Sequence, residues 1–233
     1  EITTRLVGSE MCIRDSMDTG IFRHMDFDTR IAGFADFVGR KKYLYDDNGH
    51  GTHVAGIIAG SGKGSNGKYR GIAPDTFLVS VKVLDKSGNG KIENVVEAAG
   101  WIIENKSAMN IRVVNISFGT RAKMENGPAI ETGEDDYALI MAVEKMWDSG
   151  IVVVAAAGNN GPGNTSVTAP GISKKIITVG AFDDKNFFSG RGPTRECIVK
   201  PEVVVTGSNI IACNNHQGLS LIHISEPTRR VVI

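Results

Sequence analysis

The chain has 233 residues, enough for one domain that is stable without disulfide bonds. Its 26 basic and 26 acidic side chains balance, and hydrophobic residues make up 41% of it. This composition excludes a disordered chain and gives no reason to expect nucleic acid or an anionic membrane as a partner. No apolar run approaches the roughly 20 residues that a transmembrane helix needs, so we expect no membrane span.

The two ends of the chain differ from the rest. Residues 7–16 (VGSEMCIRDS) and 220–229 (SLIHISEPTR) resemble translated sequencing-adapter sequence. Neither residues 1–16 nor residues 219–233 show helical or strand periodicity, and we expect both segments to be non-native. A genuine irregular tail is the alternative. Residues 17–218 then form the domain.

Two polar clusters come early in the chain. Asp18 is followed by Thr19 and Gly20, which alone indicates a turn or a helix cap. Residues 47–56 (DNGHGTHVAG) lead from a glycine turn into a helix of small residues, and the imidazole of His50 there could move a proton near neutral pH. Two alternatives are a metal pair of His50 with His53, which lacks a third ligand at the HExxH spacing, and a surface histidine.

Residues 62–68 read G-x-x-x-x-G-K, close to a phosphate-binding loop. Tyr69 stands where such a loop needs the Ser or Thr that binds magnesium, and the segment follows a helix, whereas a phosphate loop follows a strand. We interpret it as a flexible surface loop.

Strands and helices alternate through the middle of the chain. β-branched apolar runs predict strands over residues 77–84, 111–116, 151–156 and 176–179. An apolar stripe predicts a helix from Ile92 to Ile103, and a second helix is expected over residues 136–147. The strands are nearly all apolar, which is typical of a parallel sheet covered on both faces. The predicted class is therefore α/β, with ligands bound beyond the carboxyl ends of the strands.

A third polar cluster follows the strand at residues 151–156. Asn159 comes just after the strand end, where a side-chain amide can donate a hydrogen bond to a developing oxyanion. The alternative is an ordinary Asn-Gly turn.

The chain has three cysteines, Cys12, Cys197 and Cys213, with no CxxC spacing. We expect neither a disulfide framework nor a thiolate metal site, and we interpret the three as inert thiols.

Taken together, the clusters resemble the subtilisin-like serine proteases, the subtilases. The resemblance covers about residues 17–215 and is carried by HGTHVAG at residues 50–56, with DTG before it and AAAGN at residues 155–159 after it. It implies a three-layer α/β fold, a mostly parallel sheet with helices on both faces. It also implies a serine endopeptidase that hydrolyses peptide bonds with an Asp/His/Ser triad.

The resemblance also assigns roles to residues. Asp18 would orient and stabilise the imidazole, His50 would be the general base, and Asn159 would donate to the oxyanion. An edge strand for the substrate backbone would be formed by Ser117, Phe118 and Gly119. The opposite wall of the pocket for the substrate side chain would be formed by Ala156, Ala157 and Gly158, which favours apolar side chains there.

The resemblance weakens toward the end of the chain. The family's GTSMA motif, which presents the serine nucleophile, is absent, and neither Ser220 nor Ser225 stands in such a context. We therefore expect a truncated chain that lacks the nucleophile and is inactive. We also expect the sheet to lack its first strand, since residues 13–16 replace its apolar run, and apolar surface to be left uncovered.

Two functions stay open: a serine endopeptidase whose serine lies outside this sequence, and a non-catalytic subtilase-like domain that binds peptides. The family implies polypeptide substrates, a monomer, no cofactor for catalysis and bacterial secretion in preference to a cytoplasmic location. Structural calcium is compatible with the family, although no aspartate-rich loop stands out.

Overall fold

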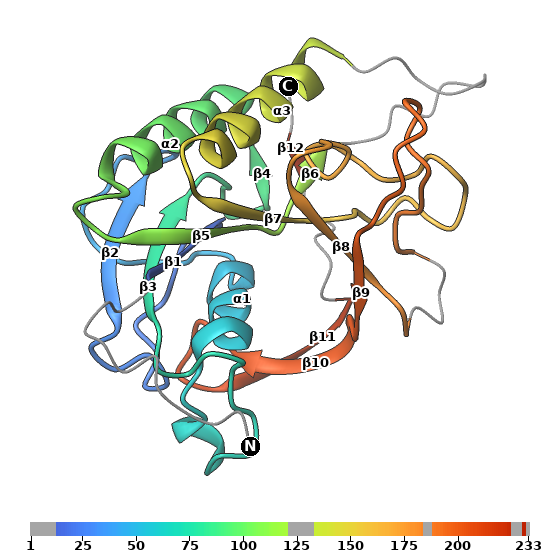
Figure 1. Cartoon of the computed structure of the whole chain (residues 1–233). Helices are drawn as coiled ribbons and strands as arrows, with labels where there is room; N and C mark the ends of the chain where they lie inside the picture. Colours follow the sequence, from blue (N-terminus) through green and yellow to red (C-terminus); the bar gives the residue numbers. More distant parts are fainter. Residues whose placement is uncertain (1–12, 121–132, 184–187, 225–229, 232–233) are drawn as a thin grey trace, which may run out of the picture.

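A seven-stranded parallel sheet forms the centre of the molecule in a computed structural model that describes residues 13–120, 133–183, 188–224 and 230–231 (Figure 1). Its strand order is β2-β3-β1-β5-β7-β8-β9, and every neighbouring pair is parallel. The strands are β1 (Ile13–Asp18), β2 (Ile31–Asp36), β3 (Phe77–Lys82), β5 (Ile111–Ile116), β7 (Val152–Ala156), β8 (Ile177–Ala181) and β9 (Val203–Val205).

Helices cover both faces of this sheet, which makes three layers (Figure 1). Helices α2 (Ile92–Asn105) and α3 (Glu134–Asp148) pack on one face and close the main hydrophobic core. Helix α1 (His50–Ala59) lies on the opposite face, where Ala55 and Ala59 pack with Leu78 of β3 in a smaller cluster. The predicted α/β class, with a mostly parallel sheet and helices on both faces, is confirmed.

Short elements complete the described structure. A 3-10 turn, η1 (Lys63–Ser65), follows α1. Strands β10 (Ser208–Cys213) and β11 (Leu219–Ile224) form an antiparallel hairpin. A small sheet consists of β4 (Asn89–Gly90), β12 (Arg230–Val231) and β6 (Gly119–Thr120), with β12 in the middle. Within the described residues, none of the helices has the length and apolarity to span a lipid bilayer.

The expectation that the sheet lacks its first strand is wrong. Strand β1 begins at Ile13 and lies in the middle of the sheet, paired with β3 on one side and β5 on the other. Parallel pairing uses main-chain groups, so two well-formed neighbours can hold a strand whose side chains do not suit the core. The mismatch is visible at Asp15, whose carboxylate is fully buried with no hydrogen-bond partner for either oxygen.

Part of the segment after residue 218 is ordered although its sequence shows no strand periodicity. Main-chain pairing with β10 organises residues 219–224 as β11, from Leu219 opposite Cys213 to Ile224 opposite Ser208. Residues 230–231 form β12. Most of the other expected non-native residues, 1–12, 225–229 and 232–233, lie outside the described part of the chain.

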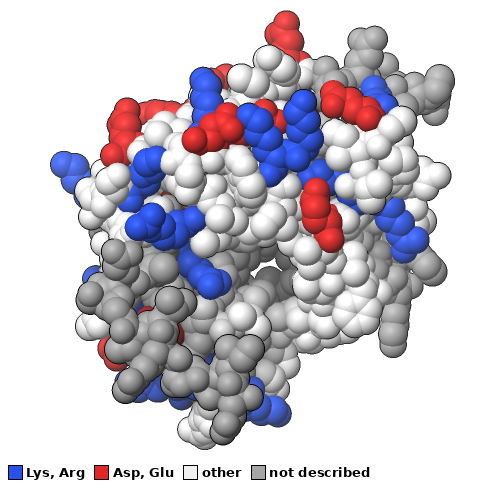
Figure 2. Space-filling view, in the orientation of Figure 1, with Lys and Arg blue, Asp and Glu red and all other residues white. Residues whose placement is uncertain are grey.

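Charged side chains of both signs are mixed on the face of the molecule seen in Figure 2, with several of each along its upper side. A hollow near the centre of this view is bordered by uncharged atoms. The described residues visible on this face therefore form no single-sign patch of the kind that binds nucleic acid.

Candidate active site

Three of the predicted site segments follow neighbouring strands of the sheet. Asp18 is the last residue of β1, Ser117 follows β5, and Asn159 lies three residues after the end of β7. Strands β1, β5 and β7 are adjacent and parallel, so their carboxyl ends lie at one edge of the sheet. This edge is where α/β proteins bind ligands.

The first residue of α1 is His50, and its ring contacts Asp18. His50 Nδ1 lies 2.7 Å from Oδ1 and 2.9 Å from Oδ2 of the Asp18 carboxylate. The exposed fractions of the two side chains are 6% and 1%. The Thr19 backbone N–H donates to the same carboxylate at 2.7 Å. A buried carboxylate that accepts from Nδ1–H fixes the tautomer in which Nε2 can take up a proton, so the pair can serve as an orienting acid and a general base.

Asp46 connects the turn after β1 to the beginning of α1. Five hydrogen bonds of 2.6 to 3.1 Å reach its carboxylate, from Thr19 Oγ1, the N–H groups of Asn48, Gly49 and Thr52, and Thr52 Oγ1. Burial acts to raise the pKa of Asp46, but these hydrogen bonds outweigh it and hold the pKa below its usual value. The ionised carboxylate therefore caps the helix that carries the base and also lies at its positive end.

Thr19 forms a second connection between the two halves of the pair. Its hydroxyl donates to Asp46 and accepts the Gly51 N–H at 2.9 Å. Gly51 also packs so closely on Gly20 that a Cβ at Gly51 would overlap the Gly20 carbonyl oxygen. The turn after Asp18 and the first turn of α1 are thus interlocked, which fixes the ring of His50 against Asp18.

Lys82, at the end of β3, supports this turn from within the protein. Its side chain is fully buried, and Nζ donates to the carbonyl oxygens of Thr19 and Leu84 and to the carboxylate of Asp47. Neither Asp46 nor Lys82 was predicted from the sequence. The signals for them were weak: an Asp three residues before the N-cap residue Gly49, and a lysine in a strand that is apolar apart from Ser80.

The second histidine of the motif has a different environment. Burial, together with the nearby charge of His50, lowers the pKa of His53 to about 4. Its Nε2 lies 3.3 Å from the carbonyl oxygen of Ser220, to which a neutral ring can donate. Since His50 is engaged by Asp18 and His53 by the main chain, the two do not converge as a metal pair.

The loop after β7 is built by close backbone contacts. Gly158 has φ +87°, and a Cβ there would overlap Thr168 Oγ1. Its carbonyl oxygen accepts the Gly190 N–H at 2.8 Å, while the Ala157 carbonyl oxygen accepts the Thr168 N–H at 3.2 Å. These contacts hold Ala157 and Gly158 against Thr168 and Gly190 and place Asn159, which is half-buried, at the turn.

Of the three residues expected to form an edge strand, Ser117 and Phe118 lie outside any strand, and Gly119 begins β6, which already pairs with an extended segment. Strand β6 begins at Gly119, and β12 lies between β6 and β4 in parallel register with both (Figure 1). The gap between β4 and β6 thus accommodates one strand. The Phe118 side chain is fully buried in the main core, so only its main chain can contact a bound peptide.

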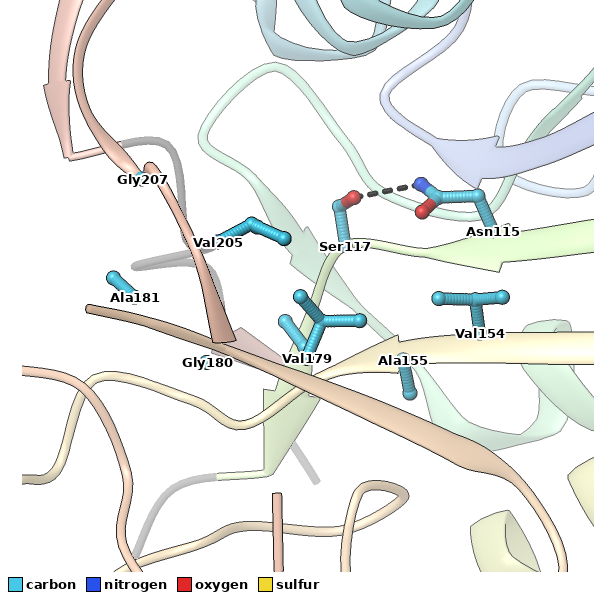
Figure 3. A pocket seen from close by; sticks show the side chains of 10 residues that line it. Asn115, Ser117, Val154, Ala155, Val179, Gly180, Ala181, Val205 and Gly207 are labelled. Carbon is cyan, nitrogen blue, oxygen red and sulfur yellow. Dashed lines mark hydrogen bonds between the residues drawn. The ribbon is translucent and has the colours of Figure 1, made fainter. Parts of the chain in front are cut away.

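A cavity of about 160 Å³ opens on the same face of the sheet as α1 (Figure 3). Asn115 and Ser117 lie on its rim, and the Asn115 amide donates to the Ser117 hydroxyl at 2.7 Å. Its other lining residues are small or apolar: Val154, Ala155, Ala156, Val179, Gly180, Ala181, Val205 and Gly207.

The loop at residues 62–68 does not form a phosphate cradle. The backbone N–H groups of Gly62 and Gly64 donate to the Asp26 carboxylate at 3.0 and 2.6 Å, and the Gly67 N–H donates to the Gly62 carbonyl. A carboxylate thus takes the donors that a phosphate would need.

The chain as a whole is similar to known proteins. The profile of peptidase S8, the subtilase family, matches residues 15–232. The chain is 44% identical over 210 residues to the serine protease AprX of Bacillus subtilis, covering 84% of this chain and 46% of AprX. It is 36% identical over 218 residues to subtilisin DY of Bacillus licheniformis, covering 90% of this chain and 72% of that protein. The chain thus spans about half the length of AprX.

Solved structures of proteins with the same fold superimpose on this chain. Sphericase superimposes with a TM-score of 0.76 at 25% identity, over 93% of this chain and 73% of that one. The S41 psychrophilic protease superimposes with a TM-score of 0.74 at 29% identity, over 92% of this chain and 72% of that one.

Proposed function

The chain belongs to the subtilase family, and on that premise we propose that it carries the acid, the base and the oxyanion donor of a serine endopeptidase. The observation that carries the proposal is the buried contact of His50 Nδ1 with the Asp18 carboxylate, at 2.7 and 2.9 Å. Its substrates are polypeptides.

In this proposal a serine hydroxyl attacks the peptide carbonyl and gives its proton to Nε2 of His50. Asp18 keeps the ring in the required tautomer and stabilises the imidazolium that forms. Asn159 donates to the oxyanion of the tetrahedral intermediate. His50 then protonates the leaving amine, and water hydrolyses the acyl-enzyme with His50 again as the base.

The nucleophile itself is not among these 233 residues. Ser220 belongs to β11, and its carbonyl oxygen lies near His53; neither it nor Ser225 has the motif that presents an activated hydroxyl. In this proposal the chain as it stands is therefore inactive, because the Asp18–His50 pair has no serine nucleophile to activate.

Peptide binding in the proposal uses the main chain of Ser117, Phe118 and Gly119 on one side and Ala156, Ala157 and Gly158 as a wall on the other. The pairing of β12 between β4 and β6 supports a strand-shaped binding gap. The small, uncharged wall favours an apolar substrate side chain.

The remaining family expectations are proposed as well. The family implies a monomer as the active form. Catalysis needs no cofactor, and any calcium is structural. The protein is secreted from a bacterium; one relative is named the minor extracellular protease Epr of Bacillus subtilis, 34% identical over 194 residues.

A fluorophosphonate probe, which reacts with activated serines, tests the peptidase proposal. The unaltered chain is expected to stay unlabelled. A chimera in which the C-terminal part of AprX replaces residues 216–233 is expected to be labelled. His50→Ala or Asp18→Asn in the chimera abolishes labelling, whereas Asp28→Asn, at an exposed carboxylate, leaves it intact.

A folded chimera that is never labelled contradicts the proposal. Labelling of the unaltered chain that is lost in His50→Ala shows that the nucleophile is present after all.

The β4-β12-β6 sheet favours a second candidate function, a non-catalytic domain that binds peptides. Deletion of residues 225–233 vacates the gap that β12 fills, so a fluorescent extended peptide is expected to bind the deleted chain more tightly than the full one. If the deleted chain binds the peptide and the folded chimera is not labelled by the fluorophosphonate probe, this second function is favoured over the first.

A further inference from the structure

Three buried side chains with metal-binding atoms lie together outside the candidate active site. His24 and Asp26 belong to the segment between β1 and β2, and Cys213 ends β10. In the part of the chain that the structure describes, they are the one group of three His, Cys, Asp or Glu side chains whose ligand atoms all lie within 4.8 Å of one another. His24 Nδ1 and Asp26 Oδ1 are 3.7 Å apart. Two donors on a tetrahedral zinc ion, with bonds of about 2.0 to 2.3 Å, are roughly 3.3 to 3.8 Å apart.

The groups around this cluster orient the donor atoms. His24 Nε2 lies 2.9 Å from the Gly218 carbonyl oxygen, which can only accept, so Nε2 carries the proton and Nδ1 carries the lone pair. Nδ1 accepts the Asp26 backbone N–H at 3.1 Å, a hydrogen bond that a metal ion would replace. The N–H groups of Gly62 and Gly64 hold the Asp26 carboxylate. A histidine whose second nitrogen donates to a carbonyl, and a carboxylate held by N–H groups, are the usual outer contacts of metal ligands.

The position of Cys213 is fixed by packing and by the turn that follows it. Cys213 is 2% exposed and belongs to the apolar cluster beneath α1. The turn between β10 and β11 docks on the segment before Asp26, since Gln217 accepts the Met25 N–H and donates to the Arg23 carbonyl oxygen. The packing of Cys213 and the docking of this turn hold the thiol beside Asp26 and His24, with the three ligand atoms within 4.8 Å of one another.

We propose that His24 Nδ1, the Asp26 carboxylate and Cys213 Sγ bind one thiophilic divalent transition-metal ion, Zn²⁺. The thiol releases its proton to solvent as the Zn–S bond forms, and no redox change occurs. One thiolate and one carboxylate neutralise the two positive charges, so the buried site has no net charge. A sulfur and an imidazole donor select zinc over calcium or magnesium. Three protein ligands leave a fourth position open.

Such an ion would join two segments that are distant in sequence. It would link the end of β10 to the segment that follows Asp18, and so stabilise the folded state without taking part in peptide hydrolysis. Because ion binding favours the folded chain, Zn²⁺ is expected to raise Tm. Neither this effect nor the binding depends on peptidase activity.

The test uses a Cys12→Ser/Cys197→Ser background of the full chain, in which Cys213 is the sole thiol. Titration with Co²⁺ is expected to give one equivalent of binding with a thiolate-to-cobalt charge-transfer band, which Zn²⁺ then displaces. Cys213→Ser, which keeps a hydroxyl of similar size, is expected to lose the band. His24→Ala is expected to weaken Co²⁺ binding at least ~10-fold, whereas His216→Ala, at an exposed histidine, leaves it unchanged.

Circular dichroism confirms that each variant is folded, and His24→Gln replaces His24→Ala if the latter is not. Zn²⁺ is expected to raise Tm of the background chain and not of the Cys213→Ser chain. The proposal is overturned if the background chain gives no charge-transfer band, or if the band and the Tm shift persist in Cys213→Ser. Equal loss of binding in His216→Ala would overturn it as well.

Discussion

Asp15 is a carboxylate in the middle of a hydrophobic core. It stands opposite Val79 of β3 and Val114 of β5, is fully buried, and has no hydrogen-bond partner for either oxygen. Burial raises the pKa of Asp15 well above its usual value. Burial thus disfavours the charged form of Asp15, and an apolar side chain is expected to be more stable at this position.

Replacement of Asp15 by Val is expected to raise the free energy of unfolding at pH 7 by at least about 2 kcal/mol, because it removes an unsatisfied buried polar group. The pKa is higher in the folded state than in the unfolded state. The contribution of Asp15 to stability is thus present below pH ~4 and is lost as the pH rises through its folded pKa. Urea denaturation between pH 4 and pH 8 measures this slope. Asp15→Asn should remove the slope, whereas Asp75→Asn, at an exposed site, should keep it.

The opposite titration is expected at Asp46. Since its pKa is lowered in the folded state, its contribution to stability is present above pH ~4 and is lost as the pH falls through its folded pKa. Asp46→Asn should lower the free energy of unfolding at pH 7 by about 2 to 3 kcal/mol, because it removes charge-assisted hydrogen bonds at the beginning of α1. The difference from the unaltered chain should shrink at pH 3. An equal difference at both pH values would contradict this view, and Asp28→Asn is the control.

The identity of the candidate residues could be predicted from the sequence, but their supports could not. Asp18 and His50 stand in short motifs, and the structure brings the two side chains into contact. Lys82 and Asp46 act through contacts that form only when β3, the turn after β1 and α1 come together. His24 and Cys213 meet for the same reason, because the hairpin that follows β10 folds back on the segment after β1. Such long-range contacts leave at most weak signals in the sequence, which spacing alone does not reveal.

At the scale of elements, the contact between α1 and the turn after β1 depends on the absence of a side chain. A Cβ at Gly51 would overlap the Gly20 carbonyl oxygen and approach the Asp18 Cβ. Gly51→Ala is therefore expected to separate the helix from the turn and to lower the free energy of unfolding by about 2 kcal/mol or more. The NMR signal of the His50 Nδ1 proton should shift as its bond to Asp18 loosens.

Gly100 of α2 offers the matched control, since nothing lies within 4 Å of a Cβ added there. Gly100→Ala is expected to raise the free energy of unfolding by about 0.5 to 1 kcal/mol, because alanine is the better helix former. A similar gain in Gly51→Ala would show that the close contact is unimportant.

Strands with two buried faces were the easiest elements to predict. The run at residues 111–116 corresponds to β5 residue for residue, and residues 151–156 differ from β7 by one. The run at residues 77–84 was too long, because the N–H groups of Val83 and Leu84 turn to the Asp18 carbonyl oxygen and leave the sheet. Strand β2 was missed, since its edge position leaves a mixed and mostly half-buried pattern with no clear periodicity.

At the scale of the whole molecule, the sheet is covered unevenly. Helices α2 and α3 close one face, whereas α1 covers only the part of the other face near β1 and β3 (Figure 1). The cavity over β5, β7 and β8 lies on the uncovered part. At the end of the strand order, all three residues of β9 are exposed. An apolar edge strand of this kind can pair with another copy of the chain.

We expect this chain to associate through β9 as its concentration rises. Val204, in the middle of β9, is 54% exposed, and Val204→Lys should suppress association, because a charge on an edge strand opposes pairing with a second strand. Val199→Lys is the matched control: Val199 is 79% exposed but lies outside any strand, so the same added charge should have little effect. Sedimentation velocity would show the Val204→Lys chain near its 24.9 kDa monomer mass, with larger species for the unaltered chain and the control. Equal suppression by both variants would mean that net charge, and not the β9 edge, governs association.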